Sequence, residues 1–308
     1  MKKIILASIL CILVGLLYCS YLGKDASKEA NKITVPLTAG KRKEYKKIDI
    51  QLDSEEYILS DLKTNQILLE KNKDARVPIA SLTKLMTTFI LLDKKTELNE
   101  KVSVDPAVVQ KLRLENASLA GFIEGDLVTV EDLAYGMILP SGGEAAVLAA
   151  KLIAGDENTF AKLMNDYAKR LGMKNTKFVN CTGLDQKENY STVYDILKFL
   201  TNALKNKFFY KVFTTLEYNT QPTPYSPKGY VLTSSLLREN QSLSLNKGKI
   251  LGGKTGYTPN AGLCLASIAE INGNKYIQVS THASGENALS SSHIKDAVKV
   301  YNYLFQSL

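Results

Sequence analysis

Ser81 and Lys84 lie three positions apart at the start of an apolar stretch with helical periodicity. Residues at positions i and i+3 share one helix face, with Cβ atoms about 5 to 6 Å apart, so the Lys84 amine can reach the Ser81 hydroxyl. A serine hydroxyl attacks well only when a base accepts its proton, and lysine becomes such a base once burial lowers its pKa from about 10.4. The neighbours Leu82, Leu85 and Met86 favour that burial. The pair therefore predicts acyl transfer through Ser81, although an N-cap serine followed by a surface lysine has the same spacing.

Lys254, Thr255 and Gly256 form a second cluster, directly after two glycines and near the start of a predicted block of strands. A cation and a hydroxyl on an edge strand are suited to bind a substrate carboxylate, while the strand backbone pairs with an extended peptide. Glycine at position 256 removes side-chain bulk beside that edge. The cluster therefore predicts a peptide-binding strand.

Ser141, Gly142 and Gly143 form a third cluster, at a break between two helical stretches. A serine there can pass protons between Lys84 and a leaving group, provided that the fold brings the three clusters together.

The elements expected to position these clusters change from strand to helix and back. Strand alternation occurs at residues 56–62 and 66–71, with a hairpin signal between them. Helical periodicity follows at 81–92, 130–137, 144–154 and 157–171. Strand patterns return at 250–257, 263–271 and 275–281, before a final amphipathic helix at 291–305. This order predicts an α/β fold of the α+β type, with an antiparallel sheet flanked by helices and an inserted, mainly helical lobe.

The N-terminus has the pattern of a membrane-targeting segment. Lys2 and Lys3 precede an uncharged apolar run at residues 4–22, which as a helix would reach about 28 Å, close to the thickness of a hydrocarbon core. No convincing small-residue cleavage site follows, which favours a retained anchor over a cleaved signal peptide. We therefore expect an anchor or signal segment at 1–22, a polar basic linker at 23–50 and a catalytic domain at 51–308, on the extracytoplasmic face of the cell membrane.

The bulk composition narrows the possible partners. The 308 residues include 39 Lys and Arg against 31 Asp and Glu, a formal net charge of +8 that predicts attraction to an anionic partner. Because no zinc-finger spacing, RNP-like motif or dense basic helix accompanies the charge, we expect no nucleic acid, and lipid or wall polymer fits better. Cys181 and Cys264 are expected to be partly buried free thiols, since their spacing fits neither zinc nor a disulfide framework. His282 and His293 are expected to be ordinary surface or packing residues.

The three clusters occur in the order of the Ser-x-x-Lys, Ser-x-Asn and Lys-Thr-Gly signature of serine β-lactamases and penicillin-binding proteins. The chain closely resembles the low-molecular-weight D-alanyl-D-alanine carboxypeptidases, which are penicillin-binding serine peptidases. The resemblance spans about residues 52–305 and includes segments 69–88, 117–121, 125–129, 135–149, 180–185, 190–195 and 253–264. It implies a β-lactamase/transpeptidase-like fold.

The resemblance also implies an activity and its catalytic residues. Ser81 would be the acylated nucleophile, Lys84 its general base and Ser141 a proton relay, with no metal and no organic cofactor. The substrate would be a peptidoglycan stem peptide that loses its terminal D-alanine, and β-lactam antibiotics would be covalent inhibitors.

For substrate binding, the resemblance implies that Lys254 and Thr255 hold the terminal carboxylate. The backbone N–H groups of Ser81 and Tyr257 would form the oxyanion hole. Gly256 and Gly143 would belong to the substrate-binding site.

The third cluster departs from the family pattern at Gly143, where family members commonly carry asparagine. Loss of one such hydrogen bond costs about 0.5 to 1.5 kcal/mol, so we expect an altered rate and not an inactive enzyme. The neighbouring Glu144 is expected to be a helix-start or surface residue.

Other interpretations share parts of this pattern. A β-lactamase would need a deacylating Glu-x-Leu-Asn segment after residue 143, and the similar residues 97–99 precede it. A catalytically weak or inactive wall-binding scaffold is supported only by Gly143. DD-endopeptidase and transpeptidase activities would use the same acyl-enzyme, so the residues do not separate them from a carboxypeptidase.

Overall fold

The computed structural model describes residues 33–37, 44–48, 50–240 and 242–303. The chain divides into two compact units, Met1–Leu52 and Asp53–Leu308. In the first unit, β1 (Ile33–Leu37) and β2 (Glu44–Ile48) form an antiparallel pair, which the expectation of a linker at 23–50 did not anticipate. The apolar run at residues 4–22 lies outside the described residues, and none of the described helices has the length and apolar character needed to cross a membrane.

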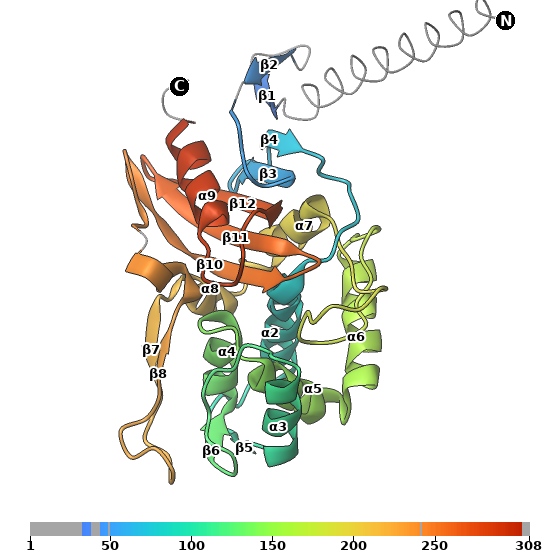
Figure 1. Cartoon of the computed structure of the whole chain (residues 1–308), viewed down its shortest axis with the longest axis vertical. Helices are drawn as coiled ribbons and strands as arrows, with labels where there is room; N and C mark the ends of the chain where they lie inside the picture. The colour runs from blue at the N-terminus through green and yellow to red at the C-terminus, as the bar shows by residue number, and fades with distance from the viewer. Residues whose placement is uncertain (1–32, 38–43, 49, 241, 304–308) are drawn as a thin grey trace, which may run out of the picture. The chain divides into compact units, whose positions relative to one another are not determined.

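An antiparallel sheet organises the second unit (Figure 1). Neighbouring strands follow the order β4 (Ile67–Lys71), β3 (Glu56–Asp61), β12 (Asn274–Ala283), β11 (Gly262–Ile271), β10 (Gly248–Thr258) and β9 (Ser244–Leu245). Because β3 pairs with β12, residues from the two ends of this unit meet inside one sheet. The expected antiparallel sheet is confirmed.

The two faces of the sheet have different partners, because successive side chains on a strand point to opposite sides. Ile268 of β11 belongs to the large apolar core, together with Phe199 of α7 (Val193–Ala203) and Phe209 of α8 (Lys207–Thr214). The adjacent Ser267 instead contacts Tyr301 of α9 (Ser292–Tyr303), whose hydroxyl lies 3.2 Å from the Ser267 hydroxyl. Helix α9 therefore covers one face, and α7 and α8 cover the other (Figure 1).

A mainly helical lobe is inserted between β4 and β10, as expected. It contains α2 (Thr83–Lys94), α3 (Pro106–Leu114), α4 (Val130–Ile138), α5 (Gly143–Ala154) and α6 (Glu157–Arg170). Helix α2 packs against α4 and α5 and is buried along most of its length. Its Phe89 makes edge-to-face contacts with rings of α6, α7 and α8, which tie the lobe to the helices beneath the sheet.

Short elements that the sequence patterns did not predict complete the unit. Strands β5 (Lys101–Ser103) and β6 (Leu127–Thr129) form one two-stranded sheet, and β7 (Glu217–Asn219) and β8 (Val231–Thr233) form another. Two 3-10 turns, η1 (Ala80–Leu82) and η2 (Ser235–Asn240), lie beside β10. Both turns contribute residues to the candidate active site.

Candidate active site

Ser81 lies in the 3-10 turn η1, and helix α2 begins only at Thr83. The helix expected from residue 81 therefore starts two residues later. Ala80, just before Ser81, has a φ of 45°, a left-handed conformation that residues with a Cβ rarely adopt. Strain of this kind persists where surrounding contacts enforce it, and it is common at functional sites.

The Lys84 amine lies 2.9 Å from the Ser81 hydroxyl oxygen and donates to the carbonyl oxygen of Thr182 at 2.8 Å. The lysine side chain is 3 % exposed. Burial lowers the pKa of Lys84 to about 8, with partial opposition from Cys181 and Glu144. About a tenth of the amine is therefore neutral at pH 7, and this fraction grows as the pH rises towards 8, in contact with the hydroxyl that the amine would deprotonate.

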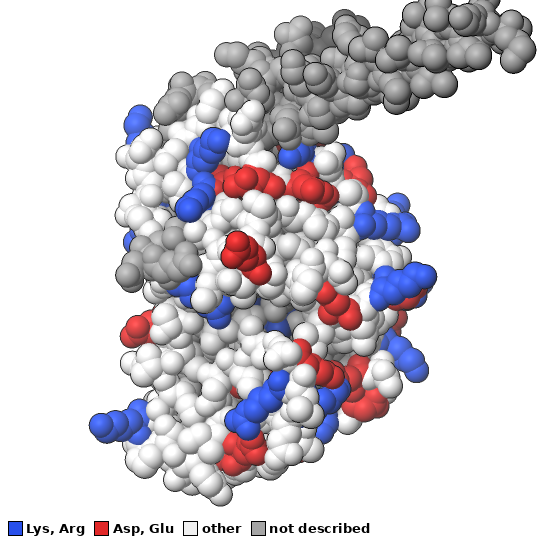
Figure 2. Space-filling view, in the orientation of Figure 1, with Lys and Arg blue, Asp and Glu red and all other residues white. Residues whose placement is uncertain are grey.

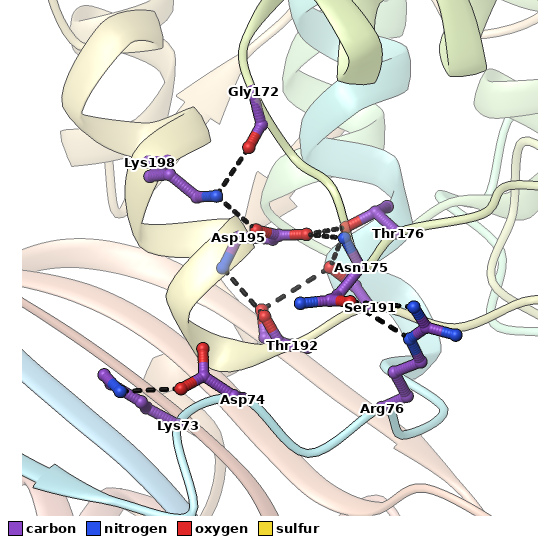
Figure 3. A network of polar contacts seen from close by, with 10 residues as sticks. All are labelled: Lys73, Asp74, Arg76, Gly172, Asn175, Thr176, Ser191, Thr192, Asp195 and Lys198. Atoms are coloured by element: carbon purple, nitrogen blue, oxygen red, sulfur yellow. Dashed lines mark hydrogen bonds and ion pairs between the residues drawn. The ribbon is translucent and has the colours of Figure 1, made fainter.

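A network of polar contacts fixes the chain that leads into η1 (Figure 3). Val77 and Ser191 exchange two backbone hydrogen bonds of 2.9 and 3.0 Å. Ser191 directly precedes the N-cap of α7. In the first turn of that helix, buried Asp195 accepts hydrogen bonds from the backbone N–H of Asn175 and the hydroxyl of Thr176, at 2.7 and 2.8 Å. The approach to Ser81 is thus held by a separate loop about a hundred residues later in the chain.

Strand β10 presents Gly256 to the turn that carries Ser81. A Cβ on Gly256 would lie 3.0 Å from the backbone nitrogen of Ser81, so glycine allows the strand to approach this N–H group closely. Strand β9 pairs only with residues 248 and 249 of β10, which leaves the rest of that edge without a strand partner in the described sheet. Thr255, Gly256 and Tyr257 line the cleft beside Ser81.

Lys254 lies in a different environment from the one expected. Its side chain is fully buried, its amine donates to the carbonyl oxygen of Thr255 at 2.6 Å, and it does not line the cleft. Burial lowers the pKa of Lys254 well below the usual value, and the nearby charges of Lys84 and Arg238 lower it further. Lys254 is therefore placed to influence its neighbours electrostatically without exposing its amine to the cleft.

Ser141 lines the same pocket as Ser81, with a φ of 71° and 5 % exposure. Its hydroxyl makes no hydrogen bond within the described part of the chain, so it is available to a group bound in the pocket. Gly143 begins α5, donates its N–H to the carbonyl oxygen of Ser118 at 2.7 Å, and lines neither cleft region. A Cβ at this position would lie 3.2 Å from that same oxygen, so a larger residue would press on the Ser118 segment.

Glu144 is a helix-start residue, as expected, but it is buried and not on the surface. One carboxylate oxygen accepts hydrogen bonds from the N–H groups of Ala120 and Gly121, at 2.7 and 3.0 Å. Burial raises the pKa of this carboxyl group. Glu144 therefore holds the segment that carries Ser118 against the start of α5.

The structure adds two residues to the site that the sequence patterns did not indicate. Arg238 of η2 and His293 of α9 line the pocket that contains Ser81, Ser141 and Thr255. Neither residue belongs to a spaced motif, and only the folding of distant segments brings them together. His293 is thus more than a surface or packing residue, because it forms a wall of the candidate site.

The cleft continues on the other side of Ser81 into a larger groove. Its walls come from α3, the start of α6, the segment 180–186 and the end of β10. Figure 2 shows Lys and Arg atoms recessed in a hollow, while side chains of both charge signs project from the surrounding surface. An extended peptide in this groove would place one bond at Ser81 and a small terminal residue in the pocket beyond it.

Among the described residues, one group of side chains could hold a metal ion. Glu55, Glu56 and His282 bring their ligand atoms within 4.8 Å of one another, and one Glu56 oxygen already contacts the hydroxyl of Thr281 and the His282 ring. These residues do not line the cleft. The cleft itself contains the Ser81 and Lys84 pair, the hydroxyl groups of Ser141 and Thr255, and the side chains of Arg238 and His293.

Comparison with known proteins decides the family. The family model for D-alanyl-D-alanine carboxypeptidase matches residues 41–285. The chain belongs to this family. The expected resemblance is confirmed, and the D-alanyl-D-alanine carboxypeptidase family consists of serine peptidases whose members share the fold described above.

Three proteins similar to this D-alanyl-D-alanine carboxypeptidase family member carry three different activity names. D-alanyl-D-alanine carboxypeptidase DacF of Bacillus subtilis is 31% identical over 281 residues, which cover 89% of this chain and 65% of the relative. D-alanyl-D-alanine endopeptidase of Pseudomonas aeruginosa is 30% identical over 254 residues, which cover 82% of this chain and 78% of the relative. The crystal structure of Streptomyces K15 DD-transpeptidase superposes with a TM-score of 0.73 and 30% identity, over 83% of this chain and 98% of that one.

Proposed function

We propose that this protein is a serine-type D-alanyl-D-alanine carboxypeptidase that removes the terminal D-alanine from peptidoglycan stem peptides. The observation that carries the proposal is the 2.9 Å separation between the buried Lys84 amine and the Ser81 hydroxyl, beside the open edge of β10. Membership of the family supports the same reaction.

The proposed reaction uses the groups in order. The neutral Lys84 amine accepts the Ser81 proton while the oxygen attacks the carbonyl carbon of the penultimate D-alanine. The N–H groups of Ser81 and Tyr257 stabilise the resulting oxyanion. The C–N bond then breaks, Ser141 relays the proton from Lys84 to the departing amine, and the Ser81 ester remains. Water, deprotonated by Lys84, hydrolyses this ester and restores the serine.

The shape of the cleft favours a carboxypeptidase over an endopeptidase. On one side of Ser81 a long groove can take several residues of a peptide, and on the other Ala288 and His293 close a small pocket. A single small leaving residue suits that pocket better than a branched cross-link. The same acyl-enzyme explains how β-lactams would inhibit, because they would esterify Ser81.

The reaction is tested with the full chain and a stem pentapeptide ending in D-Ala-D-Ala. We expect release of free D-alanine, and no release by Ser81→Ala. A cross-linked dimeric peptide is offered in parallel. Cleavage of the dimer with no release of D-alanine from the pentapeptide would replace the carboxypeptidase with an endopeptidase.

We also propose that the enzyme acts on the extracytoplasmic face of the cell membrane, anchored by the apolar run at residues 4–22. The length of that run and the two preceding lysines support this location. Deletion of residues 1–22 should release active enzyme from the membrane fraction or retain it in the cytoplasm. Recovery of the intact full chain in the soluble fraction would contradict the proposal.

A further inference from the structure

The turn between β10 and β11 follows Tyr257 closely, and hydrogen bonds from outside this hairpin hold it in place. The two backbone groups of Asn260 contact two different segments of the chain. The N–H group donates to a carboxylate oxygen of Asp185 at 3.3 Å, and the carbonyl oxygen lies 3.0 Å from Nε2 of His282. Asp185 also accepts a hydrogen bond from the Thr258 hydroxyl, at 2.7 Å. The position of the turn therefore depends on side chains that belong to neither β10 nor β11.

A β-bulge brings His282 to the turn. The pairing of β11 with β12 shifts in register between Leu263 and Leu265, so β12 carries an extra residue at this point. His282 lies in the bulge with a φ of 51°, a left-handed conformation that residues with a Cβ rarely adopt. Bulges are frequent beside active sites, where they change the direction of a side chain. The strained backbone of His282 therefore needs an explanation in what its side chain does.

The His282 ring connects the turn to the interior of the sheet. Its Nδ1 atom lies 2.8 Å from a carboxylate oxygen of Glu56 on β3, and that side chain is buried. A carboxylate and a carbonyl oxygen only accept hydrogen bonds, so each ring nitrogen must donate one. The hydrogen bond with Glu56 raises the pKa of His282, against the opposing effect of burial. His282 thus joins the carbonyl group of Asn260 to a strand that is paired on both sides.

The segment that holds the N–H group of Asn260 also contacts the catalytic pair. Thr182, three residues before Asp185, accepts the hydrogen bond from the Lys84 amine at 2.8 Å. Through Asp185 the same segment reaches the end of β10. The serine, its base and the end of the strand therefore share one support. His282 supplies the second support of the strand end, from the sheet.

We propose that His282 is a positioning residue for acylation, which holds the β10–β11 turn so that the Tyr257 N–H group faces the developing oxyanion. The proposal rests on the proposed function, because it takes Ser81 as the nucleophile and this N–H group as part of the oxyanion hole. His282 lines neither cleft region, so it acts through the turn and not on the substrate. Loss of its side chain should therefore slow the acylation step and leave ligand binding unchanged.

The test follows acylation of the full chain by a fluorescent penicillin at increasing concentrations, which gives a maximal rate constant and a half-saturating concentration. His282→Gly removes the ring and suits the left-handed backbone. Its maximal rate constant should fall by about 10- to 100-fold, because a displaced oxyanion-hole donor stabilises the transition state less. The half-saturating concentration should not change. His282→Asn should recover part of the rate, since asparagine tolerates this backbone and keeps one amide donor.

Asn272→Gly is the matched control, because Asn272 has a φ of 49°, is exposed at the other end of β11 and lines neither cleft region. It should acylate at the wild-type rate. A wild-type rate constant in folded His282→Gly would overturn the proposal, as would a loss confined to the half-saturating concentration.

Thermal unfolding shows whether each variant is folded. If His282→Gly does not fold, His282→Asn decides by the same two criteria. The proposed function fails separately: a wild type that is acylated but releases no D-alanine from a stem pentapeptide contradicts that function and leaves this comparison in force.

Discussion

A Cβ atom on Gly183 would lie 1.9 Å from the carbonyl oxygen of Ala80, the residue that precedes the nucleophile. The segment containing Thr182 and Gly183 is therefore in backbone contact with the strained turn η1. Because Thr182 also accepts the hydrogen bond from Lys84, this segment positions both the serine and its base.

Gly183→Ala should therefore lower the free energy of unfolding much more than a glycine-to-alanine substitution at another position with a similar positive φ. Gly155→Ala is the control: Gly155 has a φ of 83°, close to the 85° of Gly183, but no atom lies within 4 Å of its ideal Cβ. We expect about 1 to 2 kcal/mol of destabilisation at Gly155, from the left-handed conformation alone. At Gly183 we expect at least about 3 kcal/mol, with loss of acylation. Urea unfolding of both variants measures the difference, and equal losses would contradict the contact.

The activity should depend on pH through Lys84. Because burial lowers its pKa to about 8, the amine is protonated at lower pH and cannot accept the Ser81 proton. The value of kcat/KM should therefore rise about tenfold per pH unit up to about pH 8 and level off above it. A profile that is flat from pH 6 to 9 would show that Lys84 is not the base. Lys84→Met should lower acylation by at least about 1,000-fold without loss of folding.

The loop network of Figure 3 makes a separate prediction at Asp195. This carboxylate is 1 % exposed, and it accepts two hydrogen bonds and pairs with Lys198 at 2.5 Å. Asp195→Ala should destabilise the protein by about 3 kcal/mol, which corresponds to about 6 to 12 °C in Tm.

Asp156→Ala serves as the comparison for Asp195→Ala. Asp156 lies at the start of a helix too, as the N-cap of α6, but it is exposed, so its loss should cost only about 1 kcal/mol. Thermal unfolding distinguishes the two variants. Similar Tm values would show that the network around Asp195 contributes no more than an ordinary cap.

Gly143→Asn restores the residue common in the family and tests what glycine does here. A Cβ would lie 3.2 Å from the carbonyl oxygen of Ser118 and 3.4 Å from the Leu112 side chain. We expect a loss of about 1 to 3 kcal/mol and no gain in kcat/KM, because the neighbouring segment must shift to admit the side chain. A variant that is both more active and equally stable would contradict this expectation, and would show that glycine at position 143 only lowers the activity of the third cluster.

Much of the fold could be predicted from patterns. The helices at 130–138, 143–154 and 157–170 and the three long strands near the C-terminus lie within a few residues of their expected bounds. Such elements can be recognised from the local sequence alone, because the helices have long amphipathic periodicity and the strands are long and apolar. Strands of three residues, such as β5 and β7, carry too little pattern to be recognised, because their pairing depends on distant partners.

The site was predicted in part. The proximity of Ser81 and Lys84 follows from their spacing, although the 3-10 turn under Ser81 depends on Gly183, a hundred residues away in the chain. The burial of Lys254 could not be inferred, since a Lys-Thr-Gly pattern does not say which way the lysine points. Arg238 and His293 have no spacing signal, and only the tertiary fold places them in the pocket.

The central claim, that Ser81 becomes esterified with Lys84 as its base, is tested most directly by trapping the ester. The full chain is incubated with a fluorescent penicillin, and the intact mass and the labelled peptide are determined by mass spectrometry. We expect one adduct per chain, on the peptide that contains Ser81, and none in Ser81→Ala. A label on another residue, or an unlabelled wild type that is folded, would contradict the account.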